Sequence, residues 1–395
     1  MNNTPFYIKA QQVCCETEIK LKHFVLIEDG IITTITDTPK RGIKVIDFGA
    51  ATLIPGMIDM HIHGREGCDV MDAKLSSIKT ISASLAKHGV TGFLATTVTG
   101  DWQNTLAAFD IIGQATKQQM PGAQVLGAYN EGLFFTETHK GAHNEAFFLE
   151  LTKERVDDII SASKQSLKVM ALAPEFHNST DIIAYLSSKN IKVMLGHTNA
   201  TFKQSQAALK AGAAGGVHIF NGMSGIHHRD PGCAGAVLMD DEAIAEVIAD
   251  GVHLHPSIME MVYRLKGPKK MALISDCINA GGYPDGNYRL GELNVSVKDG
   301  IARTASGSLA GSTLTLELSV KNIINMAKVP FLEAVHMASL VPANHLGLAD
   351  SLGSIAIKKR ACLTVWDDNF KILATFIDGE LVYQPADIQP IKANV

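Results

Sequence analysis

The sequence has few of the features that mark secreted or membrane-bound proteins. It contains only six cysteines in 395 residues, irregularly spaced and without a Cys-x-x-Cys pair, which excludes a disulfide framework and a zinc knuckle. No run of about 18 apolar residues occurs, and no basic stretch followed by an apolar one stands near Met1. We therefore expect a cytoplasmic protein with no membrane partner.

An excess of one charge is also missing. The 35 Lys and Arg residues nearly balance the 40 Asp and Glu residues, and the net charge of −5 is spread without long like-charge runs. This balance excludes the basic surface that nucleic acid requires, so we expect no nucleic-acid partner. A hydrophobic content of 46% with 19% charged residues is enough for one large core and a small second one, which excludes a disordered chain.

The two ends of the sequence share a pattern of short β-strands. Phe24–Ile27 and Ile31–Ile35 are strand-like and flank a Glu-Asp-Gly turn, and Cys362–Trp366 has the same pattern near the other end. We predict a small β-sandwich domain formed by residues 1–53 together with residues 355–395.

Between these ends, residues 54–354 alternate short apolar runs with longer helical stretches. Such alternation is typical of parallel strands joined by helices, and eight repeats over nearly 300 residues favour an α/β fold of the (β/α)8 TIM-barrel type. A hairpin is expected as an insertion over Asn287–Arg303, after the eighth strand. The eight predicted strands are Leu53–Ile58, Gly92–Thr96, Gln124–Tyr129, Val169–Leu172, Ile191–Leu195, Gly216–Ile219, Ile244–Ile248 and Met271–Ile274.

Ionisable residues follow five of these strands, where a barrel carries its active site. They are Asp59, His61 and His63 after the first strand, Glu131 after the third, His197 after the fifth, His218 after the sixth and Asp276 after the eighth. The four histidines, together with the carboxylates of Glu131 and Asp276, would converge at one end of a barrel and so indicate a metal site. His61 and His63, two residues apart, project to the same side of an extended chain.

Nitrogen and oxygen ligands without thiolates suit zinc, with iron, manganese or cobalt as alternatives. A bound divalent cation lowers the pKa of its water, and a neighbouring carboxylate can take up the proton and deliver it to a leaving group. Asp276 is placed for that task.

At this point the sequence resembles the amidohydrolase superfamily and, within it, the N-acetylglucosamine-6-phosphate deacetylases, over almost its whole length. The resemblance is carried by several segments taken in order. They are Pro55–Gly64, Lys140–Asn144, Gly196–Thr198, His218–Met223, His228–Gly232, Ala249–His253, Ser275-Asp276 and Gly307–Ser312.

The resemblance implies a division of labour among the predicted ligands. Glu131, His197 and His218 would hold the principal cation, and His61 and His63 a second one, giving one or two divalent cations per chain. Asp276 would act first as general base and then as general acid. The implied reaction is hydrolysis of the N-acetyl group of N-acetylglucosamine 6-phosphate to glucosamine 6-phosphate and acetate, in amino-sugar catabolism.

The resemblance also implies a set of residues around the phosphosugar. Arg229 and His253 would reach the phosphate in the neighbouring subunit, which implies a homodimer. The full set is Ala142, His143, Asn221, Gly222, Arg229, His253, Leu309, Ala310 and Gly311.

One segment departs from the family pattern. The family usually reads His-Leu-Glu-Gly-Pro where this chain has Tyr129–Leu133. The glutamate is kept, so we expect the metal site to be intact. The departure leaves open the shape of the pocket wall and therefore the sugar epimer, so N-acetylgalactosamine 6-phosphate is an alternative substrate.

Three other interpretations are weaker. A cyclic-amide hydrolase of the same superfamily needs a carboxylated lysine at the end of the fourth strand, where this chain reads Ala171–Glu175, and Lys168 lies at the beginning of that strand. Deaminase chemistry needs no phosphate site, and the presence of Arg229 and His253 disfavours it. A catalytically inactive scaffold would be expected to lack Asp276.

Overall fold

The computed structural model describes residues 4–394, and eight parallel strands form its central sheet. Their spatial order, β17-β16-β15-β14-β13-β12-β11-β8, follows the chain, as in a (β/α)8 barrel. The strands are β8 (Met57–Ile62), β11 (Val90–Thr97), β12 (Gln124–Asn130), β13 (Leu167–Leu172), β14 (Lys192–Leu195), β15 (Gly215–Gly216), β16 (Ile244–Ile248) and β17 (Met271–Ile274). The predicted fold class is confirmed.

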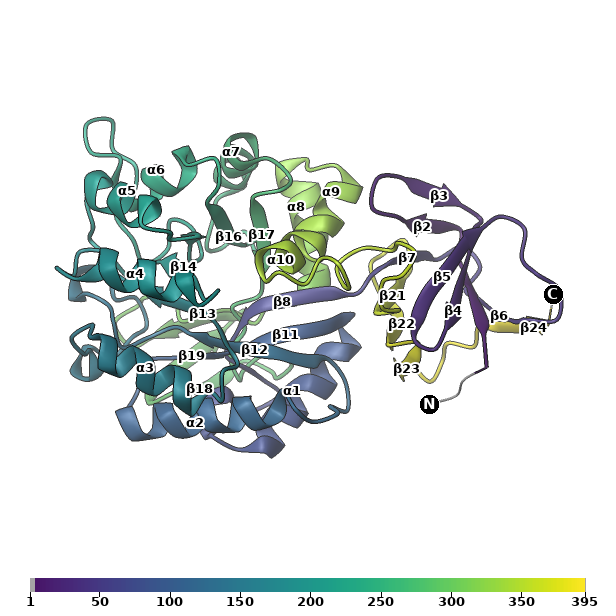
Figure 1. The fold of residues 1–395 in the computed structure, drawn as a ribbon, viewed down its shortest axis with the longest axis horizontal. Helices are drawn as coiled ribbons and strands as arrows, with labels where there is room; N and C mark the ends of the chain where they lie inside the picture. Colours follow the sequence, from purple (N-terminus) through teal and green to yellow (C-terminus); the bar gives the residue numbers. More distant parts are fainter. Residues whose placement is uncertain (1–3, 395) are drawn as a thin grey trace.

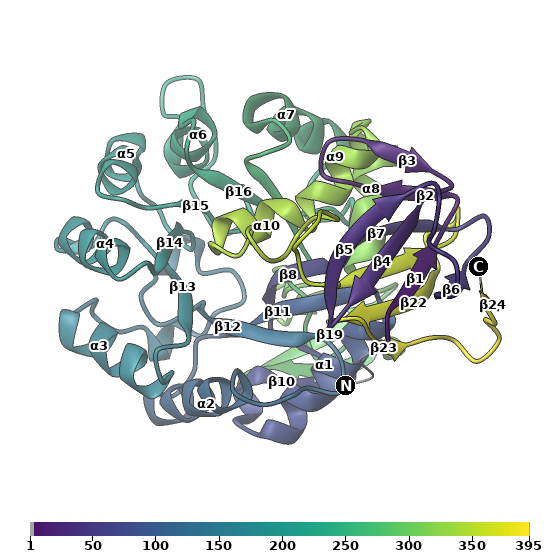
Figure 2. The ribbon, with the colours of Figure 1, turned by 45° about the vertical axis from the view of Figure 1, so that its right-hand side comes forward.

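The ring closes just beyond the last strand. Asp276 donates its backbone N–H to the His61 carbonyl at 2.9 Å, and Ile62 pairs with Cys277 in parallel. In Figure 2 the helices from α2 to α7 form an arc outside the strands. The helices are α1 (Leu75–Lys87), α2 (Trp102–Ala115), α3 (Lys153–Ala162), α4 (Ser179–Ser188), α5 (Phe202–Lys210), α6 (Gly232–Met239), α7 (Pro256–Lys266), α8 (Leu316–Ala327), α9 (Phe331–Met337) and α10 (Leu340–His345).

Apolar spacing explains how these helices cover the sheet. In α1, for example, Ile78, Ile81 and Leu85 recur at intervals of three and four residues and are buried against the strands. Among the described residues, no helix combines the length and the hydropathy needed to cross a bilayer.

The first predicted strand, Leu53–Ile58, is wrong in its bounds. The chain forms two strands here: β7 (Thr52–Pro55) belongs to a terminal sheet, and β8 begins the barrel at Met57. Gly56 lies at the junction, where a Cβ would come within 2.3 Å of the Thr91 side chain. One apolar run therefore serves two sheets, and His61 lies inside the barrel strand instead of after it.

The sixth predicted strand, Gly216–Ile219, is also too long. Only Gly215 and Gly216 pair with their neighbours, and the backbone of His218 has a φ of +23°, which no strand accommodates.

Segments from both ends of the chain form two further sheets beside the barrel (Figure 1). Their inner faces share one hydrophobic core, which includes Ile8, Val25, Leu53, Val365 and Phe376, so they form the predicted β-sandwich. The division at residues 53/54 and 354/355 stays a prediction. One sheet contains β24 (Ile391–Asn394), β6 (Lys44–Asp47), β1 (Phe6–Lys9), β4 (Phe24–Glu28) and β5 (Ile31–Thr36). The other contains β23 (Glu380–Tyr383), β22 (Ile372–Ile377), β21 (Leu363–Trp366), β7, β2 (Gln12–Cys14) and β3 (Ile19–Leu21).

The insertion after the eighth barrel strand has three strands where a hairpin was predicted. These are β18 (Gly286–Leu290), β19 (Leu293–Lys298) and β20 (Ile301–Thr304), paired in antiparallel order. The remaining elements are short: β9 (Gly64–Arg65), β10 (Cys68–Asp69), η1 (Val70–Asp72), η2 (Glu137–His139) and η3 (Glu145–Phe147).

Candidate active site

The five predicted metal ligands and the predicted acid–base residue Asp276 converge at the carboxyl ends of the barrel strands. His61 and His63 come from β8 and the residue after it, Glu131 follows β12, His197 follows β14, His218 follows β15 and Asp276 follows β17. All six are buried, with 0–6% of their surface exposed. Asp59 does not join them, because its carboxylate accepts backbone N–H groups from His61 and Ser275 inside the barrel.

Three of these residues have a strained backbone conformation that directs their side chains toward the cluster. The backbone φ values of His197, His218 and Asp276 are +46°, +23° and +49°, a region that residues other than glycine rarely adopt. Each such residue costs about 1–3 kcal/mol, and such strain is concentrated at functional sites. Gly222, at φ +61°, leaves room for one of the rings, since a Cβ there would lie 2.8 Å from His197 Nδ1.

Glu131 lies between two groups of ligand atoms. Its Oε1 is 3.2 Å from His197 Nε2 and 3.0 Å from His218 Nε2. Its Oε2 is 3.1 Å from His63 Nε2 and 3.5 Å from His61 Nε2. Asp276 Oδ1 lies on this second side, 3.2 Å from His63 Nε2. One carboxylate therefore faces two separate positions.

Each of the four imidazoles is held through its other ring nitrogen. The Nδ1 atoms of His63, His197 and His218 lie 3.0–3.3 Å from backbone carbonyl oxygens, and that of His61 lies 3.1 Å from Glu246. A hydrogen bond from Nδ1 leaves Nε2 with a free lone pair, which is the arrangement that a metal ligand needs.

The neighbouring carboxylates raise the pKa values of two of these rings. Burial alone would lower the pKa of His61, but the charges of Glu131 and Glu246 raise that pKa well above its ordinary value. Burial is likewise outweighed at His63, whose bonds to Asp276 and Glu131 raise its pKa to about 9. Burial would raise the pKa of Asp276, yet His63 and His61 hold it below its ordinary value.

The donor set fits divalent cations. Atoms bound to one zinc ion at about 2.0–2.2 Å in tetrahedral geometry lie about 3.3–3.6 Å apart, close to the observed spacings of 3.0–3.6 Å. Two triads, His61 with His63 and Asp276, and Glu131 with His143 and His197, bring ligand atoms close enough to share an ion. Because the carboxylates raise the pKa values of His61 and His63, a cation bound there would displace protons from these rings.

A cavity of about 250 Å³ opens over this cluster. Besides the ligands, it is lined by seven of the nine residues predicted to surround the sugar phosphate: Ala142, His143, Asn221, Gly222, His253, Leu309 and Gly311. The inserted sheet closes one side through Leu290 and the loop that carries Leu309. His143 contacts the ligand cluster, since its Nε2 lies 3.2 Å from His197 Nε2, and its Nδ1 lies 2.8 Å from the Thr99 hydroxyl oxygen.

Two predicted substrate residues lie outside the cavity lining. Ala310 is fully buried behind it, in the core of the inserted sheet. Arg229 is exposed at the tip of the loop before α6, where its guanidinium contacts the His228 ring at 2.6 Å.

His253 lines the cavity of its own chain, where Asp250 holds its ring through a 2.7 Å contact at Nδ1. The expectation that it reaches the phosphate in a neighbouring subunit stays a prediction.

The departure at Tyr129–Leu133 lies mostly beneath the ligands. Tyr129 is fully buried with its ring 4.7 Å from that of His61, and of the five residues only Glu131 lines the cavity. The substituted side chains therefore contact the ligands from below and do not line the cavity themselves, and the choice between the gluco and galacto epimers stays open.

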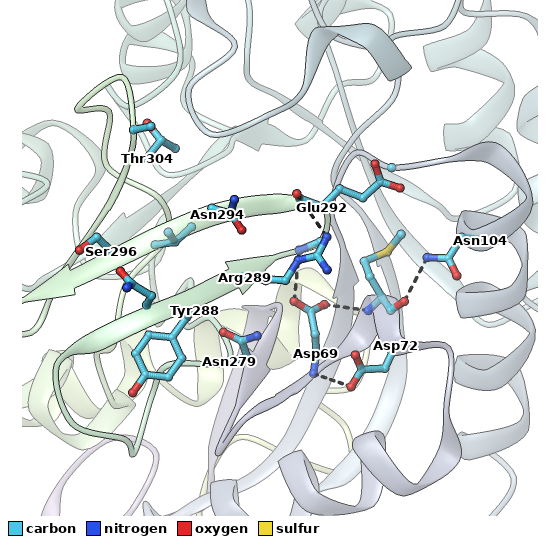
Figure 3. Close-up of a pocket in the computed structure, with 16 residues that line it drawn as sticks. Asp69, Asp72, Asn104, Asn279, Tyr288, Arg289, Glu292, Asn294, Ser296 and Thr304 are labelled. Atoms are coloured by element: carbon cyan, nitrogen blue, oxygen red, sulfur yellow. Dashed lines mark hydrogen bonds between the residues drawn. The ribbon is translucent and has the colours of Figure 1, made fainter.

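A larger cavity, of about 760 Å³, lies beside the inserted sheet (Figure 3). Asp69, Asp72 and Asn104 line one side, and the outward-facing side chains Arg289 and Asn294 line the other. Asp69 is held by the backbone N–H of Met71, and none of the predicted site residues lies there. We therefore take the smaller cavity as the candidate active site.

Sequence reasoning missed Glu246. This carboxylate lies in the middle of β16, is fully buried and contacts both His61 and the backbone N–H of His218. Its signal was present as an acidic residue inside the apolar run Ile244–Ile248, because a buried strand tolerates a charge only where a partner stabilises it.

Comparisons with known proteins agree with this geometry. The amidohydrolase family model matches residues 52–382. The chain is 45% identical to an N-acetylglucosamine-6-phosphate deacetylase of Vibrio furnissii, over 91% of this chain and 90% of that protein. It is 41% identical to an N-acetylgalactosamine-6-phosphate deacetylase of Escherichia coli O157:H7, over 95% of this chain and 98% of that protein.

A solved structure is also similar over the whole fold. It is a variant of the N-acetyl-D-glucosamine-6-phosphate deacetylase of Mycobacterium smegmatis in complex with N-acetyl-D-glucosamine-6-phosphate. The TM-score is 0.92 at 29% identity, covering 96% of this chain and 100% of that one. This chain therefore belongs to the amidohydrolase family and groups within it with the amino-sugar-phosphate deacetylases.

Proposed function

We propose that this enzyme hydrolyses the N-acetyl group of N-acetylglucosamine 6-phosphate, giving glucosamine 6-phosphate and acetate, in amino-sugar catabolism in the cytoplasm. One observation carries the chemistry: Glu131 lies between two sets of inward-facing imidazoles, next to the carboxylate of Asp276. The names of the relatives supply the substrate class.

Glu131, His197 and His218 would hold one divalent cation, and His61 and His63 with Glu131 a second, with zinc favoured by the nitrogen and oxygen donors. A cation bound there supplies Lewis acidity, which polarises the amide carbonyl and makes water a better nucleophile.

Asp276 moves the proton. Its carboxylate borders the cavity and is ionised at neutral pH, since His63 and His61 keep its pKa low. It takes a proton from water as the oxygen attacks the amide carbon. It then gives that proton to the nitrogen as the C–N bond breaks, so that acetate and a free amine leave.

The remaining residues orient the sugar. His143 and Asn221 offer hydrogen bonds near the reacting amide, and His253 lies on the same cavity wall. The exposed Arg229 would contact the phosphate from the partner subunit of a homodimer, which explains its distance from the cavity of its own chain.

The substrate assignment is tested by acetate release from four sugars, N-acetylglucosamine and N-acetylgalactosamine, each with and without a 6-phosphate. We expect the phosphorylated gluco epimer to give the highest kcat/KM. A higher value for the phosphorylated galacto epimer would establish the alternative substrate. No acetate from any of the four would contradict the proposal.

Metal content is a separate prediction. Elemental analysis of protein purified without chelators should give between one and two divalent cations per chain. His61→Asn should preferentially lose the second cation. The asparagine side chain is shorter than histidine and its amide nitrogen is not a metal ligand, while His197 and His218 are unchanged. Active protein without any divalent metal would contradict the assignment.

A further inference from the structure

Glu246 is a buried carboxylate beneath the cluster that the proposed chemistry does not use. Its Oε2 lies 3.1 Å from His61 Nδ1 and accepts the backbone N–H of His218 at 3.3 Å. The residue is fully buried in β16. It thus touches one member of each group of ligands that Glu131 separates.

His61 is distinguished from the other three imidazoles by this partner. His63, His197 and His218 each direct Nδ1 at a backbone carbonyl, whereas His61 directs it at a carboxylate. A carboxylate partner fixes the ring and makes Nε2 a stronger electron donor than a carbonyl partner does. The carboxylate partner therefore affects only the second cation position, which His61 and His63 would form.

Two further atoms beneath the cluster lack partners. Glu246 Oε1 and the Tyr129 hydroxyl oxygen are both buried without a hydrogen bond. Leaving such atoms unpaired in a protein interior is costly, and a hydroxyl donor and a carboxylate acceptor are complementary. The Tyr129 ring also lies 4.7 Å from the His61 ring, tilted by 50°. Burial, together with the nearby charge of Glu246, raises the pKa of Tyr129 well above its ordinary value. Tyr129 therefore lies close to both the carboxylate and the imidazole.

We propose that Glu246 and Tyr129 act as a positioning pair that holds His61 with Nε2 toward the cluster and so sets the affinity of the second cation position. The inference rests on the proposed function, since it concerns the cations assigned there.

The test is a zinc titration, by calorimetry and by competition with a chelator of known affinity, on the full chain after metal removal. Glu246→Gln should weaken one of the two cations by about 10- to 100-fold and leave the other nearly unchanged. Tyr129→Phe should weaken the same cation by about 2- to 10-fold. In the Glu246→Gln background, Tyr129→Phe should lose most of its effect, since the two act through one ring.

Asp59→Asn is the matched control, because Asp59 is an equally buried carboxylate that contacts the backbone N–H of His61 instead of its ring. It should leave both zinc affinities close to those of the parent. Glu246→Gln in the His61→Asn background should not change the remaining cation. If Glu246→Gln fails to fold, Tyr129→Phe tests the same cation alone.

The outcomes separate this inference from the proposed function. A parent chain that binds no zinc contradicts the cation site itself. A parent that binds two ions, with Glu246→Gln and Tyr129→Phe either without effect or weakening both ions alike, overturns the positioning pair alone. Equal weakening by Asp59→Asn overturns it as well, since any buried carboxylate would then serve.

Discussion

Asp276→Asn is expected to lower kcat by about 100- to 10,000-fold, the contribution typical of general acid–base catalysis. The amide keeps the size of the carboxylate and its place beside His63, 3.2 Å away, but it cannot take up a proton. Proton transfer to the leaving nitrogen is then lost, while the cluster that holds the cations is retained. Steady-state acetate release measures the effect.

The metal content of this variant must be measured in parallel, because a loss of cation would imitate a loss of acid–base catalysis. We expect at least one divalent cation per chain to remain, since His197, His218 and the Oε1 atom of Glu131 form the group of ligand atoms that does not include Asp276. Turnover near the parent value would show that another group moves the proton.

Loss of Arg229 should give the second large effect, through the phosphate. A charged hydrogen bond contributes about 1.5–3 kcal/mol, or about 10- to 150-fold. With His253 as a second donor, the parent should prefer the phosphorylated sugar on the order of 100-fold or more in kcat/KM. Arg229→Ala should reduce that preference and leave the slow reaction of the plain sugar nearly unchanged, because Asp276 and the cation ligands are untouched. Arg264→Ala, at an exposed arginine of α7, is the control.

Mixing two variant chains tests whether Arg229 acts from the partner subunit of the proposed homodimer. When Arg229→Ala and Asp276→Asn subunits are mixed, one site in each hybrid would combine an intact Asp276 with an intact Arg229 from its partner. Recovery of phosphate-dependent activity is expected for contact across the interface. Equal slowing of both sugars by Arg229→Ala would show that this residue does not bind the phosphate.

Much of the fold could be predicted because the barrel repeats one simple pattern. Each buried parallel strand is a short apolar run, and each helix shows apolar residues at three- and four-residue spacing, as in α1. Residues at the carboxyl ends of the strands must share one end of a barrel, so His197, His218 and Asp276 could be brought together without knowing any distance.

Other features depend on three-dimensional packing that periodicity does not record. The run from Leu53 to Ile58 reads as one strand, and only the crowding of Gly56 against Thr91 reveals two sheets. The inward direction of Tyr129 and the partnership of Glu246 with His61 depend on the register between neighbouring strands. Sequence alone therefore predicted which side chains converge at the barrel end, but not the buried residues Tyr129 and Glu246 that contact His61.

Anomalous X-ray diffraction at the zinc absorption edge, from crystals grown with zinc, locates the cations most directly. We predict one peak about 2.0–2.2 Å from Glu131 Oε1 and the Nε2 atoms of His197 and His218. A second peak is expected among Glu131 Oε2 and the Nε2 atoms of His61 and His63. The absence of any peak at these five side chains, in crystals of protein that releases acetate, would contradict the proposed metal-dependent mechanism.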